Sequence, residues 1–348
     1  MPRSPADESG LAFPADLDAW RRWVRGRHPI IETVRALKDR RNGPLPLVPT
    51  LGLPTGEATT LVVVDQASPS ARAAVQAPLA HLDPSTTAVL TPHEDLLPDH
   101  LPSRRAYAGP RSLPTCVDTV LSLGAFNPLS AAVAAWVKPR GARFVVVQHG
   151  LLTRWSPPLS DGDHLLAWSQ ADADYWTAGR ASITSEVVGS QLLWRAGRES
   201  RVSLRDERPV LLGQLHGTEL TRREALRTYL RFGRAVDVDY RPHPNERDLA
   251  SRAAHRLMRR AGLRFAESTG SLLDLHRPVV SIFSTGTLEA AQRGLPAWVV
   301  HAAPPPWIED LWERYALSRW GADPTPAWPA PSTEPAAAVA ARLNDPDG

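Results

Sequence analysis

The chain has 348 residues, with 40 Lys and Arg against 37 Asp and Glu, a formal net charge of +3. This length suffices for two domains, each with its own hydrophobic core. The basic residues are dispersed along the sequence rather than gathered in one block, which argues against a nucleic-acid partner. No apolar run approaches the ~18 residues of a membrane-spanning helix, although an anionic membrane surface remains a candidate partner.

The single cysteine, Cys116, excludes an internal disulfide and any multi-cysteine metal site. One free cysteine fits the reducing environment of the cytoplasm. The opening sequence, MPRSPADESG, lacks the apolar segment of a signal peptide. We therefore expect a cytoplasmic protein.

The N-terminal part of the chain predicts an irregular segment followed by a helix. Residues 1–15 show no periodic pattern, whereas residues 16–41 place Trp20 and Trp23 among arginines with helical spacing. The favoured interpretation is an amphipathic helix packed on the first domain. The alternative is a helix that touches an anionic membrane, on the inner face of which a lipid-linked acceptor would lie.

Short apolar runs then alternate with helical segments. The predicted strands of the first series are 59–66, 87–92, 106–109, 118–124, 143–150, 164–169 and 185–190, and its helices are 70–82, 128–137 and 170–179. The second series has strands at 209–215, 236–244, 263–267, 279–283 and 297–300, and helices at 218–232, 246–262, 271–276 and 287–293. Residues 323–335 are rich in proline and are expected to be irregular.

Continuous apolar strands that alternate with helices indicate parallel sheets covered on both faces. Two such series predict an α/β protein with two facing Rossmann-like doubly wound domains. The predicted division is an N-terminal extension (1–58), an acceptor domain (59–190), a nucleotide-donor domain (191–322) and a Pro/Ala-rich tail (323–348). Ligands of such sheets bind beyond the carboxyl ends of the strands, so residues at those ends are the candidates for function.

The sequence FSTGTLEA joins an apolar strand to a helix and has the composition of an anion site. Helix N-termini present unpaired N–H groups and a partial positive charge, so phosphates bind there. Gly286 would allow close approach of a phosphate, Ser284, Thr285 and Thr287 offer hydroxyl groups, and Glu289 can accept a hydrogen bond from a ribose. A simple helix cap made by Ser284 or Thr285 explains the same residues equally well.

The sequence DYRPHPNE places His243 between two prolines at the end of a predicted strand. A histidine there can donate to a phosphate or protonate a leaving oxygen, which we favour over a role as a helix cap. In LLGQLHGTELT, His216 lies between two glycines at another strand end, a second and weaker candidate for an anion site.

The clearest strand of the first series ends in VVVQHG. His149 would point into a cleft between the domains, as a base for an acceptor hydroxyl or as a donor to phosphate; a partly buried loop histidine is the equal alternative. Asp161 or Asp163 in the following loop is a further candidate base.

Several motifs are absent or unconvincing. Neither a P-loop nor a G-x-G-x-x-G fingerprint occurs, and three Asp-x-Asp pairs suggest chance rather than a metal site. IFSTG departs from a nucleophile elbow because Ile282 replaces the first glycine, and no acid and histidine follow in the required order.

Taken together, VVVQHG, EVVGS, YRPHPNE and STGTLEAAQRGLP resemble nucleotide-sugar glycosyltransferases of the two-Rossmann-domain (GT-B) architecture. The most similar families are bacterial surface-polysaccharide enzymes: polysialyltransferases, Kdo transferases and CDP-glycerol glycerophosphotransferases. The resemblance covers roughly residues 60–320. It implies transfer of a sugar or polyol phosphate from a nucleotide-activated donor to a cell-surface glycan or glycolipid, with no bound metal or other cofactor.

The resemblance also implies roles for the candidate residues. His243 would contact the donor phosphate and act as general acid, hydroxyl groups at the helix start would bind phosphate, Glu289 would bind ribose, and His149 would lie near the acceptor. The donor-binding residues would be Arg241, His243, Ser284, Thr285, Gly286, Thr287, Glu289 and His216, and the catalytic residues His149, His243 and Asp161. The acidic pair that carries the base of polysialyltransferases is not found, so the identity of the base stays open.

Two other functions remain as alternatives. A non-hydrolysing nucleotide-sugar 2-epimerase has a similar His-Pro corner and strand–turn–helix, but acts without an acceptor. A non-catalytic nucleotide- or nucleic-acid-binding protein is the other alternative, although no aromatic stacking motif supports RNA binding.

Overall fold

A computed structural model describes residues 10–27, 48–217, 219–266, 270 and 272–345. The fold is α/β, with one mixed eight-stranded sheet and one parallel five-stranded sheet. The chain divides into two compact units. The first unit comprises Phe13–Gly150, Ser156–Trp194 and the chain from Pro331 onward; the second comprises the chain up to Ala12, Leu151–Trp155 and Arg195–Ala330.

The sheet of the first unit has the strand order β4-β1-β3-β2-β5-β6-β7-β8. Its strands are β1 (Thr50–Leu53), β2 (Thr60–Val63), β3 (Thr87–Thr91), β4 (Ser103–Ala106), β5 (Thr119–Ser122), β6 (Arg143–Val147), β7 (Asp163–Ala167) and β8 (Thr184–Val187). The six strands from β3 to β8 in this order pair in parallel. The central strands β2 and β5 are buried throughout, as their apolar runs require.

Helical segments cover both faces of this sheet because successive crossovers run in opposite directions from β2. The crossover from β2 to β3 contains α3 (Pro69–Ala71), the π-helical η2 (Arg72–Gln76) and the 3-10 helix η3 (Ala77–His81), which together fill the predicted helix 70–82. The other connections of this sheet contain η4 (Glu94–Leu96), η5 (Pro110–Ser112), α4 (Pro128–Val137), η6 (Lys138–Arg140) and α5 (Gln170–Thr177), and α6 (Gln191–Arg198) follows its last strand, β8.

The helix α1 (Leu17–Arg27) packs on the first unit, as the favoured interpretation predicted. Trp20 meets the ring of Phe126 edge-on, with centroids 6.0 Å apart. Arg21 Nη2 donates to the Ala125 carbonyl at 2.8 Å. The predicted continuation of this helix to residue 41 lies outside the described residues.

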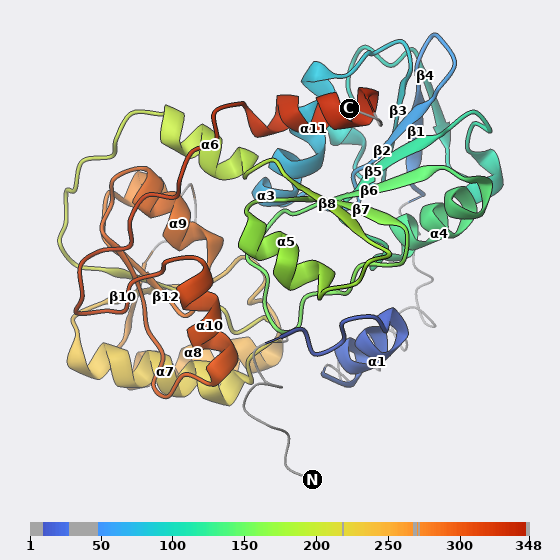
Figure 1. The fold of residues 1–348 in the computed structure, drawn as a ribbon. Helices are drawn as coiled ribbons and strands as arrows, with labels where there is room; N and C mark the ends of the chain where they lie inside the picture. Colours follow the sequence, from blue (N-terminus) through green and yellow to red (C-terminus); the bar gives the residue numbers. More distant parts are fainter. Residues whose placement is uncertain (1–9, 28–47, 218, 267–269, 271, 346–348) are drawn as a thin grey trace. The chain divides into compact units, whose positions relative to one another are not determined.

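The sheet of the second unit is parallel throughout, with the order β11-β10-β9-β12-β13. Its strands are β9 (Val210–Leu212), β10 (Asp239–Arg241), β11 (Arg264–Phe265), β12 (Val279–Ser281) and β13 (Ala297–Val299); its helices are α7 (Arg222–Ala235), α8 (Leu249–Arg260), η7 (Leu273–Leu275), α9 (Thr285–Gln292) and α10 (Pro306–Arg314). The crossovers through α7 and α8 run in one direction and that through α9 in the other, so α9 covers the opposite face (Figure 1).

The prediction of parallel strands alone is wrong for the first unit. β1 pairs antiparallel with both β3 and β4 and adds an edge that the sequence did not indicate. β1 is short and lies in a stretch that reads as turns, and every residue of β4 is exposed, so neither shows a buried-strand pattern. The strand predicted at 106–109 overlaps β4 only at Ala106.

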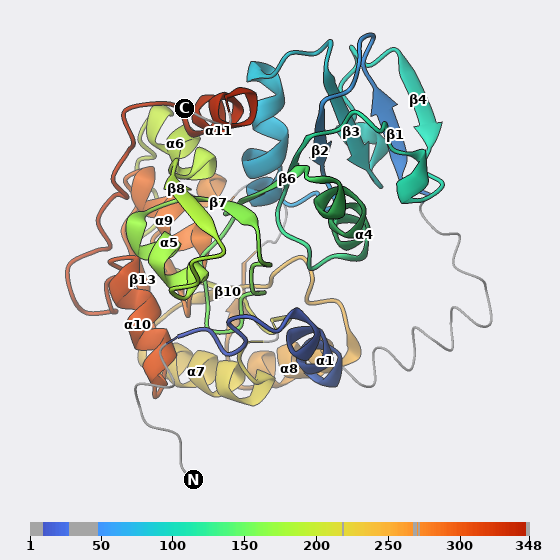
Figure 2. The same ribbon diagram turned by 45° about the vertical axis from the view of Figure 1, so that its right-hand side comes forward.

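The C-terminal residues differ from the predicted tail. The segment Arg195–Ala330 belongs to the second unit, so the predicted tail begins in that unit. The helix α11 (Pro335–Asn344) belongs to the first unit. Val339, Ala340 and Leu343 of α11 pack into the core cluster that contains Val62 and Val75. Figure 2 shows α11 beside the segment that follows β2. The chain therefore returns to complete the first core.

Among the described helices, none combines the length and apolar character needed to cross a membrane.

Candidate functional site

The strand order of the second unit locates a candidate site. In chain order, β11-β10-β9-β12-β13 is 3-2-1-4-5, which matches the first five strands of the doubly wound order 3-2-1-4-5-6, and the order reverses between β9 and β12. Ligands of open parallel sheets bind at this reversal, beyond the carboxyl ends of the strands. The segments that leave β9, β10 and β12 there contain His216, His243 and Ser284.

Gln214 holds the ends of β9 and β12 together at this reversal. Its Oε1 accepts from the backbone N–H groups of Ile282 at 3.2 Å and Phe283 at 3.0 Å, and its Nε2 donates to the Phe283 carbonyl. The Gln214 backbone N–H donates to the hydroxyl of Tyr229, a fully buried residue of α7. The start of α9 is therefore fixed relative to the turn that carries His216.

His216 and His243 form a stacked pair, with ring centroids 3.7 Å apart and an angle of 16° between the rings. The Asn245 N–H donates to His243 Nδ1 at 3.1 Å, so the neutral ring carries its proton on Nε2. His216 has its Nδ1 buried without a partner among the described residues. The corner thus presents an imidazole N–H donor of fixed tautomer beside a second imidazole with an unused nitrogen.

The buried carboxylate of Glu246 holds this corner in place. Glu246 Oε1 accepts from the Leu215 N–H at 2.9 Å, and its Oε2 contacts the Tyr240 hydroxyl at 2.8 Å and His255 Nε2 at 2.7 Å. Glu246 is only 5% exposed. A Cβ at Gly213 would lie 2.4 Å from Tyr240 Oη and 2.5 Å from Glu246 Oε1, so this position must be glycine.

Arg241 at the end of β10 has an unused donor. Its Nη2 donates to the Gly270 carbonyl at 2.6 Å, whereas its Nη1 is buried and has no partner among the described residues. Burial lowers the pKa of Arg241, which nevertheless stays charged at neutral pH. A buried guanidinium donor without a partner is unfavourable unless an anion or other acceptor binds it.

The start of α9 forms the helix cap that the alternative interpretation predicted. Ser284 is the N-cap, and its Oγ accepts from the Gly286 N–H at 3.2 Å. Thr285 is half-buried at the first helical position. A Cβ at Gly286 would lie 3.1 Å from Leu272 and 3.2 Å from Leu212, so close packing already requires a small residue there. A cap and a phosphate site are compatible, because other N–H groups of the first turn remain for a ligand.

Two residues predicted in this segment are placed differently. Thr287 is fully buried and its Oγ1 lies 2.8 Å from Ser281 Oγ, so its hydroxyl serves the core rather than a ligand. Glu289 is half-buried near Glu199 and Arg293, and burial raises its pKa.

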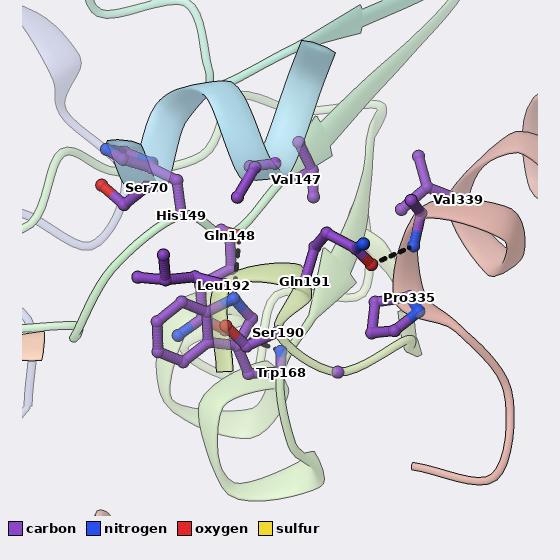
Figure 3. Close-up of a pocket in the computed structure, with 14 residues that line it drawn as sticks. Ser70, Val147, Gln148, His149, Trp168, Ser190, Gln191, Leu192, Pro335 and Val339 are labelled. Carbon is purple, nitrogen blue, oxygen red and sulfur yellow. Dashed lines mark hydrogen bonds between the residues drawn. The ribbon is translucent and has the colours of Figure 1, made fainter. Parts of the chain in front are cut away.

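The first unit has its own pocket at the carboxyl ends of β6, β7 and β8 (Figure 3). Ser70 and His149 lie at one end of it and Pro335 and Val339 at the other. His149 Nδ1 is buried without a partner among the described residues, and burial lowers the pKa of His149 to about 4. This imidazole is neutral at pH 7, so its Nδ1 can take part in a hydrogen bond with a ligand.

Gln148 fixes the backbone that leads to His149. Its Oε1 accepts from the Trp168 N–H at 2.8 Å, and its carbonyl accepts from Trp168 Nε1 at 2.9 Å. Its Nε2 donates to the Gly150 carbonyl at 3.1 Å. Gln191 closes the pocket by accepting from the Ala336 N–H at 2.9 Å.

The structure does not bring Asp161 together with His149. Asp161 precedes β7, and Asp163 pairs in register with Phe144 near the start of β6, whereas His149 follows the end of β6. The loop from His149 to Asp161 therefore crosses to the opposite edge of the sheet. Asp161 also binds Arg180 and Ser182, and these interactions lower its pKa, which makes it a weak base.

A carboxylate that the sequence analysis missed lies at the carboxyl edge instead. Asp65 follows β2, which has β3 on one side and β5 on the other. The strand order of the parallel part of the sheet therefore reverses at β2. Its Oδ2 accepts from Asn127 Nδ2 at 3.0 Å and Ser130 Oγ at 2.9 Å, and its Oδ1 is buried with no partner in the described part of the chain. Burial raises the pKa of Asp65. The signal in the sequence was an aspartate directly after a buried strand.

Other missed residues are supporting ones. Gln214 and Glu246 stand beside the histidines that the sequence analysis selected, and Gln148 directly precedes His149. A polar residue next to the end of a predicted strand was the feature of the sequence that could have identified them. Within the described residues, no three His, Cys, Asp or Glu side chains are grouped as metal ligands.

Acid should destabilise the protein through its buried histidines. Burial lowers the pKa values of His149 and His216 from 6.5 to about 4. Between these values the unfolded chain binds protons that the folded chain does not, so the free energy of unfolding falls as the pH decreases through this window. We expect a smaller decrease in His149→Gln than in the wild type, measured by urea unfolding at about pH 7 and about pH 5. The exposed His100→Gln is the control, and an unchanged decrease in His149→Gln would contradict the prediction.

No protein-family model matches the chain, and the curated proteins include no sequence similar to it.

Proposed function

We propose that the protein is a nucleotide-dependent glycosyltransferase of the GT-B type. It transfers a sugar or polyol phosphate from a nucleotide-activated donor to a cell-surface glycan or lipid-linked acceptor, without a bound metal. The reaction takes place in the cytoplasm, at the inner face of the membrane.

The observation that carries this proposal is the set of unused donors at the strand reversal of the second unit. Arg241 Nη1 is buried without a partner among the described residues, and His243, two residues further along the chain, presents Nε2–H. The first turn of α9 begins at the same reversal. A guanidinium, an imidazole and a helix N-terminus together suit the diphosphate of a nucleotide.

The residues of the second unit account for departure of the nucleotide. Arg241 and the first turn of α9 stabilise the negative charge that develops on the leaving phosphate. His243 donates a hydrogen bond from Nε2–H to the leaving phosphate and keeps its proton, and the Asn245 N–H holds the ring in this tautomer. Glu246 positions the corner through Leu215 and Tyr240 and takes no proton in the reaction.

The acceptor side belongs to the first unit. His149 and Asp65 follow strands of its sheet at the carboxyl edge, and each has an unpartnered buried atom among the described residues. The carboxylate of Asp65, whose pKa burial raises, can take the proton of an acceptor hydroxyl as it attacks, whereas His149, whose pKa burial lowers, can accept a hydrogen bond from that hydroxyl. Asp65 therefore fills the role that Asp161 was predicted to have.

The epimerase alternative uses the same donor site without an acceptor. A purified protein that converts a UDP-sugar to its 2-epimer with no acceptor present, followed by NMR, would establish that alternative. A transferase leaves the sugar configuration unchanged under these conditions. The non-catalytic alternative predicts nucleotide binding with no turnover under either condition.

Nucleotide binding should stabilise the protein through Arg241. We expect one of CMP, CDP, UDP or GDP to raise the melting temperature, since a ligand at ~100 times its Kd adds about 2.7 kcal/mol. Loss of a charged hydrogen-bond donor in Arg241→Gln removes about 1.5–3 kcal/mol of binding free energy, or roughly 10- to 150-fold in Kd. A thermal-shift titration measures both effects.

Arg319→Gln is the matched control, because Arg319 is an exposed arginine of the same unit that pairs with Glu309. It should respond to nucleotide as the wild type does. If no nucleotide stabilises the wild type, or if Arg241→Gln responds equally, the assignment of the donor site is wrong.

A further inference from the structure

The dispersed arginines of the sequence gather on one layer of the second unit. The helix α7 contains Arg222, Arg223, Arg227, Arg231 and Arg234, and α8 contains Arg252, Arg256, Arg259 and Arg260. Against these nine arginines the two helices contain one acid, Glu224. Their formal charge is thus +8, whereas the whole chain carries +3. The basic residues are dispersed along the sequence, but these nine arginines are grouped in the folded protein.

The topology explains why the two helices share a face. The chain passes from β9 through α7 to β10 and on through α8 to β11, and both right-handed crossovers run in the same direction. The helices pack against each other, and both views show them side by side (Figure 1, Figure 2). We call this pair the α7–α8 layer.

The outer side of the α7–α8 layer is open. Most of the arginines are exposed, and their spacing of three or four residues places them in rows along each helix. Arg223, Arg227, Arg256 and Arg260 have no ion pair or hydrogen bond to any other described residue. Like charges at this spacing repel each other and destabilise a helix, so internal stability does not account for the rows.

Apolar side chains lie among these arginines. Leu249 at the start of α8 is 78% exposed and Leu257, two turns later, is 48% exposed. The aromatic residues of α7, Tyr229 and Phe232, are buried instead. A single-stranded nucleic acid would favour exposed aromatic rings for base stacking, whereas a lipid surface favours arginines interleaved with exposed leucines.

We propose that the α7–α8 layer binds the surface of an anionic lipid membrane. The arginines contact lipid phosphates, and Leu249 and Leu257 enter the boundary between headgroups and acyl chains. The inference deepens the proposed function, since it assigns membrane contact to the second unit instead of to α1. Membrane binding does not depend on catalysis, because the α7–α8 layer contains none of the donor-site residues.

The test is co-sedimentation with vesicles, without donor or acceptor. Wild-type protein should bind phosphatidylcholine vesicles that contain about one-third phosphatidylglycerol, and should bind pure phosphatidylcholine at least roughly tenfold more weakly. Binding should weaken as the salt concentration rises from ~0.1 M to ~0.5 M. Each arginine near such a surface contributes about fivefold to the binding constant, so Arg227→Gln with Arg256→Gln should lose roughly 25-fold.

Two further variants make the test specific. Arg22→Gln with Arg25→Gln changes two exposed arginines of α1 and should bind as the wild type does. Leu249→Ser with Leu257→Ser should weaken the binding that remains at high salt. The double arginine variant should keep its nucleotide-induced thermal shift, so a failure of membrane binding is distinguishable from a failure of the donor site.

Wild-type binding by the double arginine variant, or loss of binding only in the α1 variant, would overturn the proposal. Absence of vesicle binding together with tight, salt-sensitive binding of a single-stranded RNA would also overturn it, in favour of a nucleic-acid partner.

Discussion

Replacement of His243 by alanine is expected to lower kcat by about 10²- to 10³-fold, the range for loss of one hydrogen-bond donor to charge that develops in the transition state. The variant cannot donate from Nε2–H to the leaving phosphate, and the stacking contact with His216 is lost. Because His243 is exposed at the corner, the fold should survive. Initial-rate measurements of nucleotide release, once the thermal-shift screen has identified the donor, test the prediction.

The control for this variant is His276→Asn. His276 belongs to the same unit but precedes β12, at the amino edge of the sheet, and its φ of 51° is one that asparagine tolerates. We expect its kcat to stay within about twofold of the wild type. If His243→Ala turns over as fast as His276→Asn, His243 does not stabilise the leaving phosphate.

Replacement of Glu246 by leucine is expected to cost about 3–5 kcal/mol in the free energy of unfolding, because each buried polar group that is left without a partner costs about 1–3 kcal/mol. The change leaves the Leu215 N–H, the Tyr240 hydroxyl and His255 Nε2 without the acceptor that they share. Urea denaturation measures the loss. The corner that carries His243 should also loosen, so nucleotide binding should weaken in parallel.

Glu309→Leu is the comparison for Glu246→Leu. Glu309 is an exposed carboxylate of the same unit, paired with Arg319 at 2.7 Å. Exposed ion pairs contribute about 0–1 kcal/mol, so this variant should be nearly as stable as the wild type. Equal stability of the two variants would show that the network around Glu246 is not needed for folding.

The strands and helices that flank the site were predictable because their patterns are local. Val279–Ser281 is a buried apolar run, Ser284 is a favoured N-cap residue, and α9 begins directly after it. The capping box of Thr221 and Glu224 likewise marks the start of α7. The edge strands β1 and β4 were not predictable, since short and exposed strands bury no apolar pattern.

The candidate site was only partly predictable for the same reason. His149, His216 and His243 were selected because each follows an apolar run, and the structure locates all three after strand ends. The stacking of His216 on His243, the clamp by Gln214 and the shared acceptor Glu246 depend on which strands are neighbours. Asp161 was misplaced because loop residues near a histidine in sequence can lie at the other edge of a sheet.

The sequence by itself determined the alternation of strands and helices, the helix caps and the residues that follow each strand. Only the tertiary structure decided the strand orders, and with them the reversal between β9 and β12, the unused donor of Arg241 and the gathering of nine arginines on the α7–α8 layer. The physical reason is the distance along the chain over which each interaction acts. Side-chain periodicity and capping act over a few residues, whereas strand neighbours are chosen by burial of apolar surface between segments far apart in the chain.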